Sequence, residues 1–206
     1  MHILYSDDAV LVVDKPAGML SVPGRGEGKR DCAAARVQAL FADALVVHRL
    51  DMATSGLLLM ARGSAAQRRL GSAFAQREVE KRYVAVVAGR PPASGEIDLP
   101  LIADWPNRPL QKVDREHGKP SLTRFRVLAY NAADDSARVE LEPLTGRSHQ
   151  LRVHLCALGH PIVGDALYAP PPIRTATTRL LLHACALRVA HPTTGQPLAF
   201  ASAVPF

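Results

Sequence analysis

Short apolar runs separated by clusters of turn residues dominate the pattern of this chain. Apolar runs of this length, and alternating apolar and polar positions, are typical of strands. On this basis we expect strands at residues 9–13, 45–47, 57–60, 81–87, 96–102, 122–130, 137–141, 180–189 and 198–206. A polar turn joins the segments 122–130 and 137–141, which predicts a hairpin.

Helical spacing of apolar residues is found in two segments of the first half. Residues 33–42 are rich in Ala and follow Asp31, which can cap a helix. Residues 65–76 follow Ser64, a second candidate cap, and carry one apolar face and one basic face. The glycine-rich segment 21–30 ahead of both predicts an exposed loop.

A third helix is expected from Thr145-Gly146 to Gly159, because these residues are typical of a helix start and a helix end. Helical spacing places His149 and Arg152 on one face of it. With the strands, the helices indicate a mixed α/β fold, an α+β fold with many antiparallel neighbours. The 206 residues are enough to bury a sizeable core in one domain.

Charge narrows the choice of partners. Lys and Arg number 25 against 19 Asp and Glu, a formal net charge of +6. The segment 61–82 contains six basic and two acidic residues, so most of the excess positive charge lies there. This distribution points to a polyanionic partner, although many basic proteins bind nothing acidic.

Other sequence features limit the location and the metal chemistry. We find no signal-peptide pattern and no apolar stretch of membrane-spanning length. Three widely separated cysteines, with no Cys-x-x-Cys pair, suit reduced thiols in a cytoplasmic protein. His149 and His154 lie five apart with no Glu between them, so they do not form the zinc motif. We therefore expect a cytoplasmic protein without a metal and without a membrane partner.

The stretch from His48 to Ala61 places charged residues between two apolar runs. Asp51 is therefore expected to be carried into the interior, where a carboxylate is costly unless it is paired. It is either part of a structural ion pair or a reactive group, and spacing alone favours the ion pair.

The segment 103–112 contains prolines that interrupt helices and strands. It holds the only tryptophan, Trp105, close to Arg108. An aromatic side chain beside basic ones suits stacking on an unpaired base. A tryptophan packed under a proline-rich loop is an equally frequent alternative.

Six motifs then occur in a recognisable order. They are Asp-Lys-Pro-Ala-Gly (14–18), His-Arg-Leu-Asp-x-x-Thr-Ser-Gly-Leu (48–57), Lys-x-Tyr-x-Ala (81–85), Thr-Gly-Arg-Ser-His-Gln-Leu-Arg-x-His (145–154), Gly-His-Pro-Ile-x-Gly-Asp-x-Leu-Tyr (159–168) and Leu-x-Leu-His-Ala (180–184). In this order, and over nearly the whole chain, they resemble the RNA pseudouridine synthases of the RluA type. The segments 98–109 and 118–120 resemble the members that modify both large-subunit rRNA and the tRNA anticodon loop.

The resemblance implies a pseudouridine synthase catalytic fold, a mainly antiparallel sheet flanked by helices and loops with a central active-site cleft. It implies one catalytic domain over residues 1–206, with no accessory N-terminal RNA-binding domain. The expected activity is isomerisation of specific uridines to pseudouridine in structured RNA, in a tRNA anticodon stem-loop and a 23S rRNA hairpin. We expect a monomer that uses no cofactor, because the isomerisation is redox-neutral and the substrate supplies every atom.

The resemblance also assigns the catalytic residues. Asp51 matches the catalytic aspartate, acting either as a nucleophile or as a base. Arg152 matches the arginine that keeps this carboxylate ionised, as a nearby guanidinium does. Tyr83 matches the tyrosine that stacks on the uracil, although a half-buried tyrosine of a sheet is the more frequent role for such a residue. His48 is expected to be structural.

RNA contacts follow from the same comparison. Arg49 matches the arginine that fills the space left by a flipped uridine. Arg147 and His149 are assigned more weakly, to RNA contacts or to support of the site. Trp105 and Arg108 join them as candidate base-stacking residues.

Two other classes of protein stay open. One is an RNA-binding or RNA-folding module without catalysis, against which the presence of Asp51, Tyr83 and Arg152 counts. The other is a carboxylate-based nucleoside or glycoside hydrolase, but such enzymes usually use a pair of acids, and Asp51 is the only acid in the central stretch.

Overall fold

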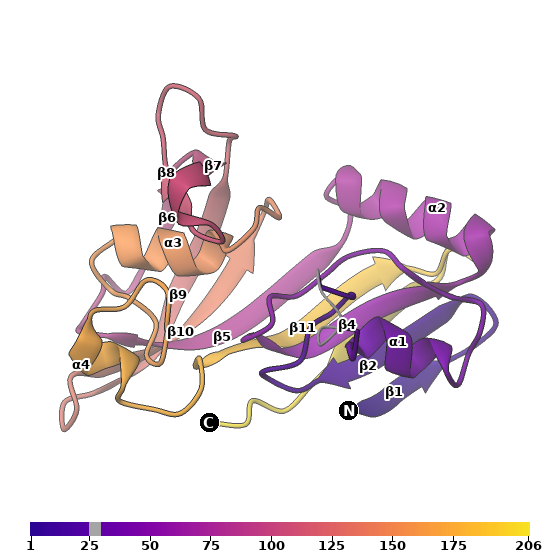
Figure 1. Ribbon diagram of the computed structural model, residues 1–206, viewed down its shortest axis with the longest axis horizontal. Coiled ribbons are helices and arrows are strands. Elements are labelled where there is room, and N and C mark those ends of the chain that lie inside the picture. Colours follow the sequence, from indigo (N-terminus) through magenta and orange to yellow (C-terminus); the bar gives the residue numbers. More distant parts are fainter. Residues whose placement is uncertain (25–29) are drawn as a thin grey trace. The chain divides into compact units, whose positions relative to one another are not determined.

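The computed structural model describes residues 1–24 and 30–206 (Figure 1). Residues 25–29 of the predicted loop at 21–30 lie outside the described residues. The chain divides into two compact units, each formed by segments distant in sequence. Unit 1 comprises Met1–Lys81 and Ala184–Pro205, and unit 2 comprises Arg82–His183 with Phe206.

Unit 1 is a sheet with two helices. Its strands are β1 (His2–Ser6), β2 (Val10–Lys15), β3 (Ala44–Val46), β4 (Ser55–Arg62), β11 (Leu182–Ala190) and β12 (Pro197–Ala201). The hydrogen-bonded order is β1-β2-β4-β11, while β3 pairs with β4 and β12 with β11. Its helices are α1 (Ala33–Gln38) and α2 (Gly63–Ala75).

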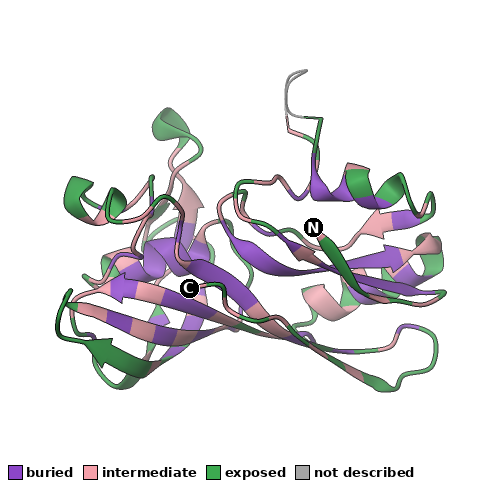
Figure 2. Ribbon diagram, turned by 90° about the horizontal axis from the view of Figure 1, so that it is seen from below, coloured by how far each residue is buried: buried purple, intermediate pink, exposed green. Residues whose placement is uncertain are grey.

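The core of unit 1 forms around β4. Residues 55–61 of this strand are all buried, as expected for a continuous apolar run covered on both faces. Figure 2 shows buried positions in purple. Leu57 and Leu59 share a cluster with Leu70 of α2 and Leu187 of β11. The apolar face predicted for the second helix therefore packs on this sheet.

The predicted caps of both helices are wrong. The amide N–H of Ala35 is bonded to the Sγ of Cys32 at 3.4 Å, so Cys32 caps α1. Asp31 instead accepts hydrogen bonds of 2.7 Å from the Nε and Nη2 atoms of Arg36. The second helix begins at Gly63, before Ser64, and its start has no side-chain cap. The carboxylate that the sequence offered as a cap is occupied by a guanidinium.

Unit 2 holds an antiparallel sheet in which strands distant in sequence are neighbours. The order is β5 (Glu80–Ala88), β10 (Ser136–Pro143), β9 (Leu122–Asn131) and β6 (Ser94–Asp98), with antiparallel pairing between neighbours. β10 alternates buried and half-buried residues, the two-residue period of a strand with one covered face. A separate small sheet pairs β7 (Leu101–Ala103) with β8 (Gln111–Val113). The helices are α3 (Gln150–Ala157) and α4 (Pro171–Arg174).

Two predictions for unit 2 need correction. The single strand expected at 96–102 is two strands in different sheets, β6 and β7. The segment 103–112, expected to lack regular structure, contains the end of β7, the 3-10 turn η2 (Trp105–Asn107) and the start of β8. The segment is thus a short hairpin with a turn at its tip. The predicted hairpin of β9 and β10, and the α+β fold class, are confirmed.

The predicted third helix begins five residues later than expected, at Gln150. His149 has a φ of 54°, a left-handed conformation that cannot continue into a helix from Thr145. The Oγ1 hydroxyl of Thr145 bonds the Oε1 atom of Gln150 at 2.7 Å. The residues 145–149 therefore form a fixed loop that leads into α3.

Gly56 of β4 leaves no room for a side chain. Its φ is +112°, and a Cβ atom there would overlap the backbone of Ala184, 2.7 Å from the amide nitrogen. We expect Gly56→Ala to lower the free energy of unfolding by more than about 3 kcal/mol, because neither backbone can move away. Urea titration measures this. The control is Gly71→Ala within α2, where a Cβ meets nothing within 4 Å and a gain of up to about 1 kcal/mol is expected. Equal effects of the two substitutions would contradict the steric role given to Gly56.

Candidate active site

Asp51 lies in a turn whose backbone is fixed on both sides. The Ser21 hydroxyl donates to the carbonyl of Leu50 at 2.7 Å and accepts the amide N–H of the same residue at 3.0 Å. The amide of Thr54 donates to the carbonyl of Asp51 at 3.1 Å. The Asp51 side chain is half-buried. The turn therefore presents a carboxylate from a rigid main chain.

A fully buried lysine adjoins this turn. The Nζ ammonium of Lys15 donates to the carbonyls of Pro16, Met19 and Met52, at 3.0, 2.8 and 3.2 Å. Met52 directly follows Asp51 in the chain. A buried ammonium is tolerated only when acceptors surround it, and here main-chain oxygens supply them. Lys15 thus fastens the motif at 14–18 to the turn that carries Asp51.

Lys15 was not among the residues singled out in the sequence. The sequence feature that could have pointed to it is a lysine at the end of an apolar strand, directly before Pro16.

His48 attaches the motif at 48–57, which carries Asp51, to strand β4. Its Nε2 atom accepts the amide N–H of Leu59 at 2.9 Å, and its ring stacks on Phe74 with centroids 4.5 Å apart. Burial, aided by the charge of Lys81, lowers the pKa of His48 to about 3. The ring is therefore neutral at physiological pH, and these contacts agree with the structural role expected for it.

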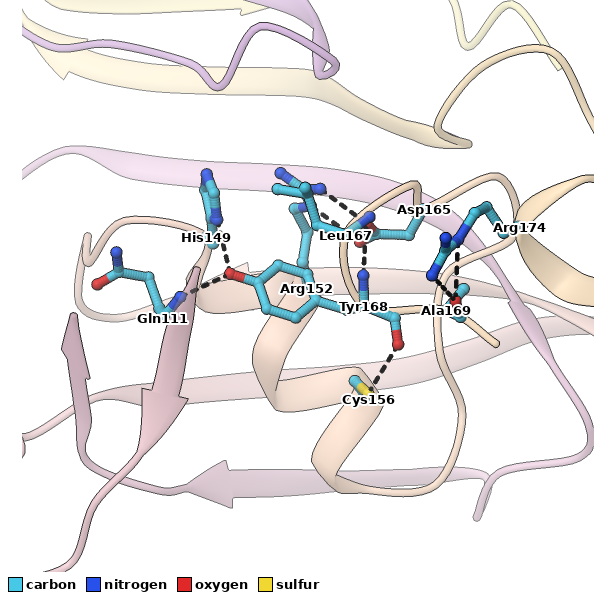
Figure 3. Close-up of polar contacts among 9 residues, drawn as sticks. All are labelled: Gln111, His149, Arg152, Cys156, Asp165, Leu167, Tyr168, Ala169 and Arg174. Carbon is cyan, nitrogen blue, oxygen red and sulfur yellow. Dashed lines mark hydrogen bonds and ion pairs between the residues drawn. The ribbon is translucent and has the colours of Figure 1, made fainter. Parts of the chain in front are cut away.

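Arg152 is buried in unit 2 and held by a carboxylate that the sequence did not single out (Figure 3). Its Nε and Nη2 atoms donate to the two carboxylate oxygens of Asp165 at 2.8 and 2.7 Å. The two side chains are 4% and 1% exposed, which makes this a desolvated, bidentate ion pair. Asp165 stands in the motif at 159–168, but no sequence spacing signals this pairing. The pairing of Arg152 with Asp51 stays a prediction.

Asp165 also fixes the chain that follows it. Its Oδ1 atom accepts the amide N–H groups of Leu167 at 2.9 Å and Tyr168 at 3.2 Å. The Tyr168 ring lies against the guanidinium of Arg152, with its centroid 5.1 Å from Cζ. One carboxylate therefore orients both an arginine and the aromatic ring beside it.

Three other predicted residues of unit 2 lie in β5 and in the loop before α3. Tyr83 is half-buried in β5, opposite Leu141 of β10. Arg147 is exposed in the loop ahead of α3, and its amide N–H donates to Oε1 of Gln150 at 3.0 Å. The Nδ1 atom of His149 lies 2.7 Å from the hydroxyl oxygen of Tyr168. The structure thus brings His149 and Arg152 together around one tyrosine.

Trp105 is not packed under its loop. Its side chain is 64% exposed, in the turn between β7 and β8. The guanidinium of Arg108 stacks on its ring at 3.9 Å from the centroid. This arrangement argues against the packing alternative and leaves an aromatic and cationic pair at the surface. Arg49, in unit 1, is also exposed.

The described residues show neither a membrane-spanning helix nor a cluster of metal ligands. No helix within residues 1–24 and 30–206 is long and apolar enough to cross a membrane. In the same ranges, no three His, Cys, Asp or Glu side chains are grouped so as to hold a metal ion.

Comparisons with known proteins define the class. Residues 9–157 match the family model described as RNA pseudouridylate synthase. The chain belongs to the RNA pseudouridine synthase family, whose members are isomerases that form pseudouridine in RNA. The family expected from the six sequence motifs is therefore confirmed.

Individual relatives are similar over almost the whole chain. The dual-specificity RNA pseudouridine synthase RluA of Escherichia coli K12 is 55% identical over 205 residues, 99% of this chain and 93% of that protein. The protein of the same name from Yersinia pestis is 51% identical over 201 residues, 97% of each chain.

Among solved structures, human RNA pseudouridylate synthase domain containing 1 aligns with a TM-score of 0.82 and 32% identity. The alignment covers 99% of this chain and 83% of that one. Human RNA pseudouridylate synthase domain containing 4 gives 0.77 and 26%, over 98% and 88%.

The neutral state of His48 generates a pH-dependent prediction. An unfolded histidine takes up a proton below a pH of about 6.5, whereas His48 in the fold does not until about 3. Stability is therefore lost as the pH falls from 6.5 towards 3, by at most about 1.4 kcal/mol per pH unit. We expect the stability of the wild type to fall by about 1 to 2 kcal/mol more than that of His48→Gln between pH 6 and pH 4. Urea unfolding at both pH values measures the difference, and parallel curves would refute the neutral buried state.

Proposed function

We propose that this protein isomerises specific uridines to pseudouridine in a tRNA anticodon stem-loop and in a 23S rRNA hairpin. Two observations support this choice of RNA. The segment 98–109 resembles that of family members acting on both RNA classes. The similar proteins from Escherichia coli and Yersinia pestis carry the name dual-specificity RNA pseudouridine synthase.

The proposed reaction needs one ionised carboxylate, that of Asp51. The N1–C1′ bond of the uridine breaks, the uracil turns, and C5 bonds to C1′, after which C5 releases its proton. No electrons are gained or lost, and every atom comes from the substrate. Asp51 acts either as a nucleophile or as the base that removes a ribose proton. The rigid turn that Ser21 and Lys15 hold in place is the observation that carries this assignment.

The two other proposed catalytic residues support this carboxylate and the base. Arg152 keeps Asp51 charged, since a guanidinium in a dry environment favours the ionised acid. The ion pair with Asp165 fixes the plane of this guanidinium before RNA arrives. Tyr83 stacks on the uracil and handles the proton that leaves C5.

Recognition of a structured RNA requires the uridine to leave its stack, at a cost of a few kcal/mol. Arg49 is exposed and lies two residues before Asp51 in the sequence. Its side chain fills the space that the uridine leaves. Arg147 and His149 contact the RNA ahead of α3, and the stacked pair of Trp105 and Arg108 offers a surface for an unpaired base. Because contacts to phosphates supply much of the affinity, binding weakens as salt rises.

The remaining features of the proposal rest on the sequence and on its resemblance to the family. The protein acts as a monomer in the cytoplasm, as one catalytic domain, without a cofactor. The rival function is an RNA-binding or RNA-folding module that does not catalyse.

Asp51→Asn separates these two functions. We expect this substitution to lower the rate of pseudouridine formation by at least about a thousandfold, because the amide can act neither as nucleophile nor as base. Affinity for the stem-loop stays near that of the wild type. Release of tritium from [5-³H]uridine-labelled RNA measures the rate, and fluorescence anisotropy measures the affinity.

The matched control is Asp8→Asn, an exposed aspartate of unit 1, which should retain the wild-type rate. Turnover in the Asp51→Asn protein would sink the mechanism. A wild-type protein that binds the stem-loop but releases no tritium would favour the rival module.

A further inference from the structure

Tyr168 is held at three of its atoms by three different parts of unit 2 (Figure 3). Its amide N–H donates to Oδ1 of Asp165 at 3.2 Å, and its carbonyl accepts from the Sγ of Cys156 in α3 at 3.4 Å. Its hydroxyl accepts the amide N–H of Gln111 at 2.9 Å. The same hydroxyl lies 2.7 Å from Nδ1 of His149. The residue therefore has little freedom to move.

The hydroxyl joins two segments that the proposed function assigns to RNA contacts. Gln111 is the first residue of β8, directly after the turn that carries Trp105 and Arg108. His149 is the last residue before α3, in a left-handed conformation. When His149 carries its proton on Nε2, its Nδ1 accepts the Tyr168 O–H while the hydroxyl oxygen accepts the Gln111 N–H. Both partners are then satisfied at once.

The hairpin on the far side of this hydrogen bond is internally ordered. Asp104 donates its amide N–H to the carbonyl of Leu110, Asn107 donates to Asp104, and Leu110 donates to Asn107, over 2.9 to 3.1 Å. At its base, Leu101 and Lys119 exchange two backbone hydrogen bonds. A hairpin held in this way moves as one piece, so a bond at Gln111 orients the exposed Trp105 and Arg108 together.

The ring of Tyr168 contacts Arg152 as well as His149. It lies against the Arg152 guanidinium and meets the His149 ring edge to face, with centroids 5.7 Å apart. The Tyr168 ring limits the rotation of the buried Arg152 guanidinium and adds a cation–π attraction to it.

We propose that Tyr168 is a positioning residue that holds the RNA-contacting hairpin 101–113 in register with Arg152. This inference rests on the proposed function, because it takes Trp105 and Arg108 as RNA contacts and Arg152 as a catalytic residue. The hydroxyl pre-organises the hairpin for RNA, which raises affinity without adding a contact to it. The ring keeps Arg152 in place for the reaction.

Tyr168→Phe and Tyr168→Leu separate the two roles. The phenylalanine variant loses only the hydroxyl, so the stem-loop binds about three- to tenfold more weakly while the single-turnover rate at saturating RNA stays within about twofold. The leucine variant also loses the ring, and its rate at saturation falls by about tenfold or more. Tyr130→Phe is the control, because that hydroxyl bonds Asp135 on the exposed hairpin of β9 and β10. The control should bind and react as the wild type.

A double-mutant cycle with Trp105→Ala tests the coupling itself. If the Tyr168 hydroxyl acts through the hairpin, the substitution Tyr168→Phe weakens binding less in the Trp105→Ala background than in the wild type. Additive losses overturn the proposal, as does wild-type affinity of either single variant. A Tyr168→Phe protein that melts at a lower temperature yet binds normally also overturns it. The cycle measures binding alone, so its outcome does not depend on whether Asp51 performs the chemistry.

Discussion

The buried ion pair of Arg152 and Asp165 is the interaction on which the arrangement of unit 2 depends. Removing two charges from water is costly, and the cost is offset here by a bidentate geometry and by the amides of Leu167 and Tyr168. Because Asp165 occupies one edge of the guanidinium, its plane is set by the fold and not by the RNA. Tyr168, ordered by the same carboxylate, extends this constraint to His149 and to the β7–β8 hairpin.

In unit 1, other kinds of side chain fix the turn that carries Asp51. The Asp51 turn is held by the Lys15 ammonium and the Ser21 hydroxyl, both of which bond main-chain carbonyls. His48 fastens the start of the motif to β4 as a neutral acceptor. Since these contacts lie within the fold, the carboxylate is positioned before any substrate binds. In the proposed mechanism, pre-organisation of this kind lets a single acid serve as the reactive group.

Much of the fold was predictable from the sequence, and the elements that the sequence did not predict were missed for physical reasons. The buried run of β4 and the alternation of β10 are local signals, so both strands were predicted. The edge strand β1 was missed because its short apolar run, Ile3 to Tyr5, is mostly exposed and does not alternate with polar residues. The late start of α3 was missed because a left-handed His149 has no signature in residue type. For the proposed site, the motifs singled out Asp51 and Arg152, but the contacts of Lys15 are to main-chain oxygens that residue types do not reveal.

The proposed mechanism depends on the orientation of Arg152 and not only on its charge. Arg152→Lys tests it most directly, because lysine keeps the charge but cannot form the bidentate pair with Asp165. The measurement is the single-turnover rate of pseudouridine formation at saturating RNA, with folding verified by circular dichroism. We expect the rate to fall by about a hundredfold or more in a folded, RNA-binding protein. A rate within about threefold of the wild type would show that charge alone suffices and would contradict the account.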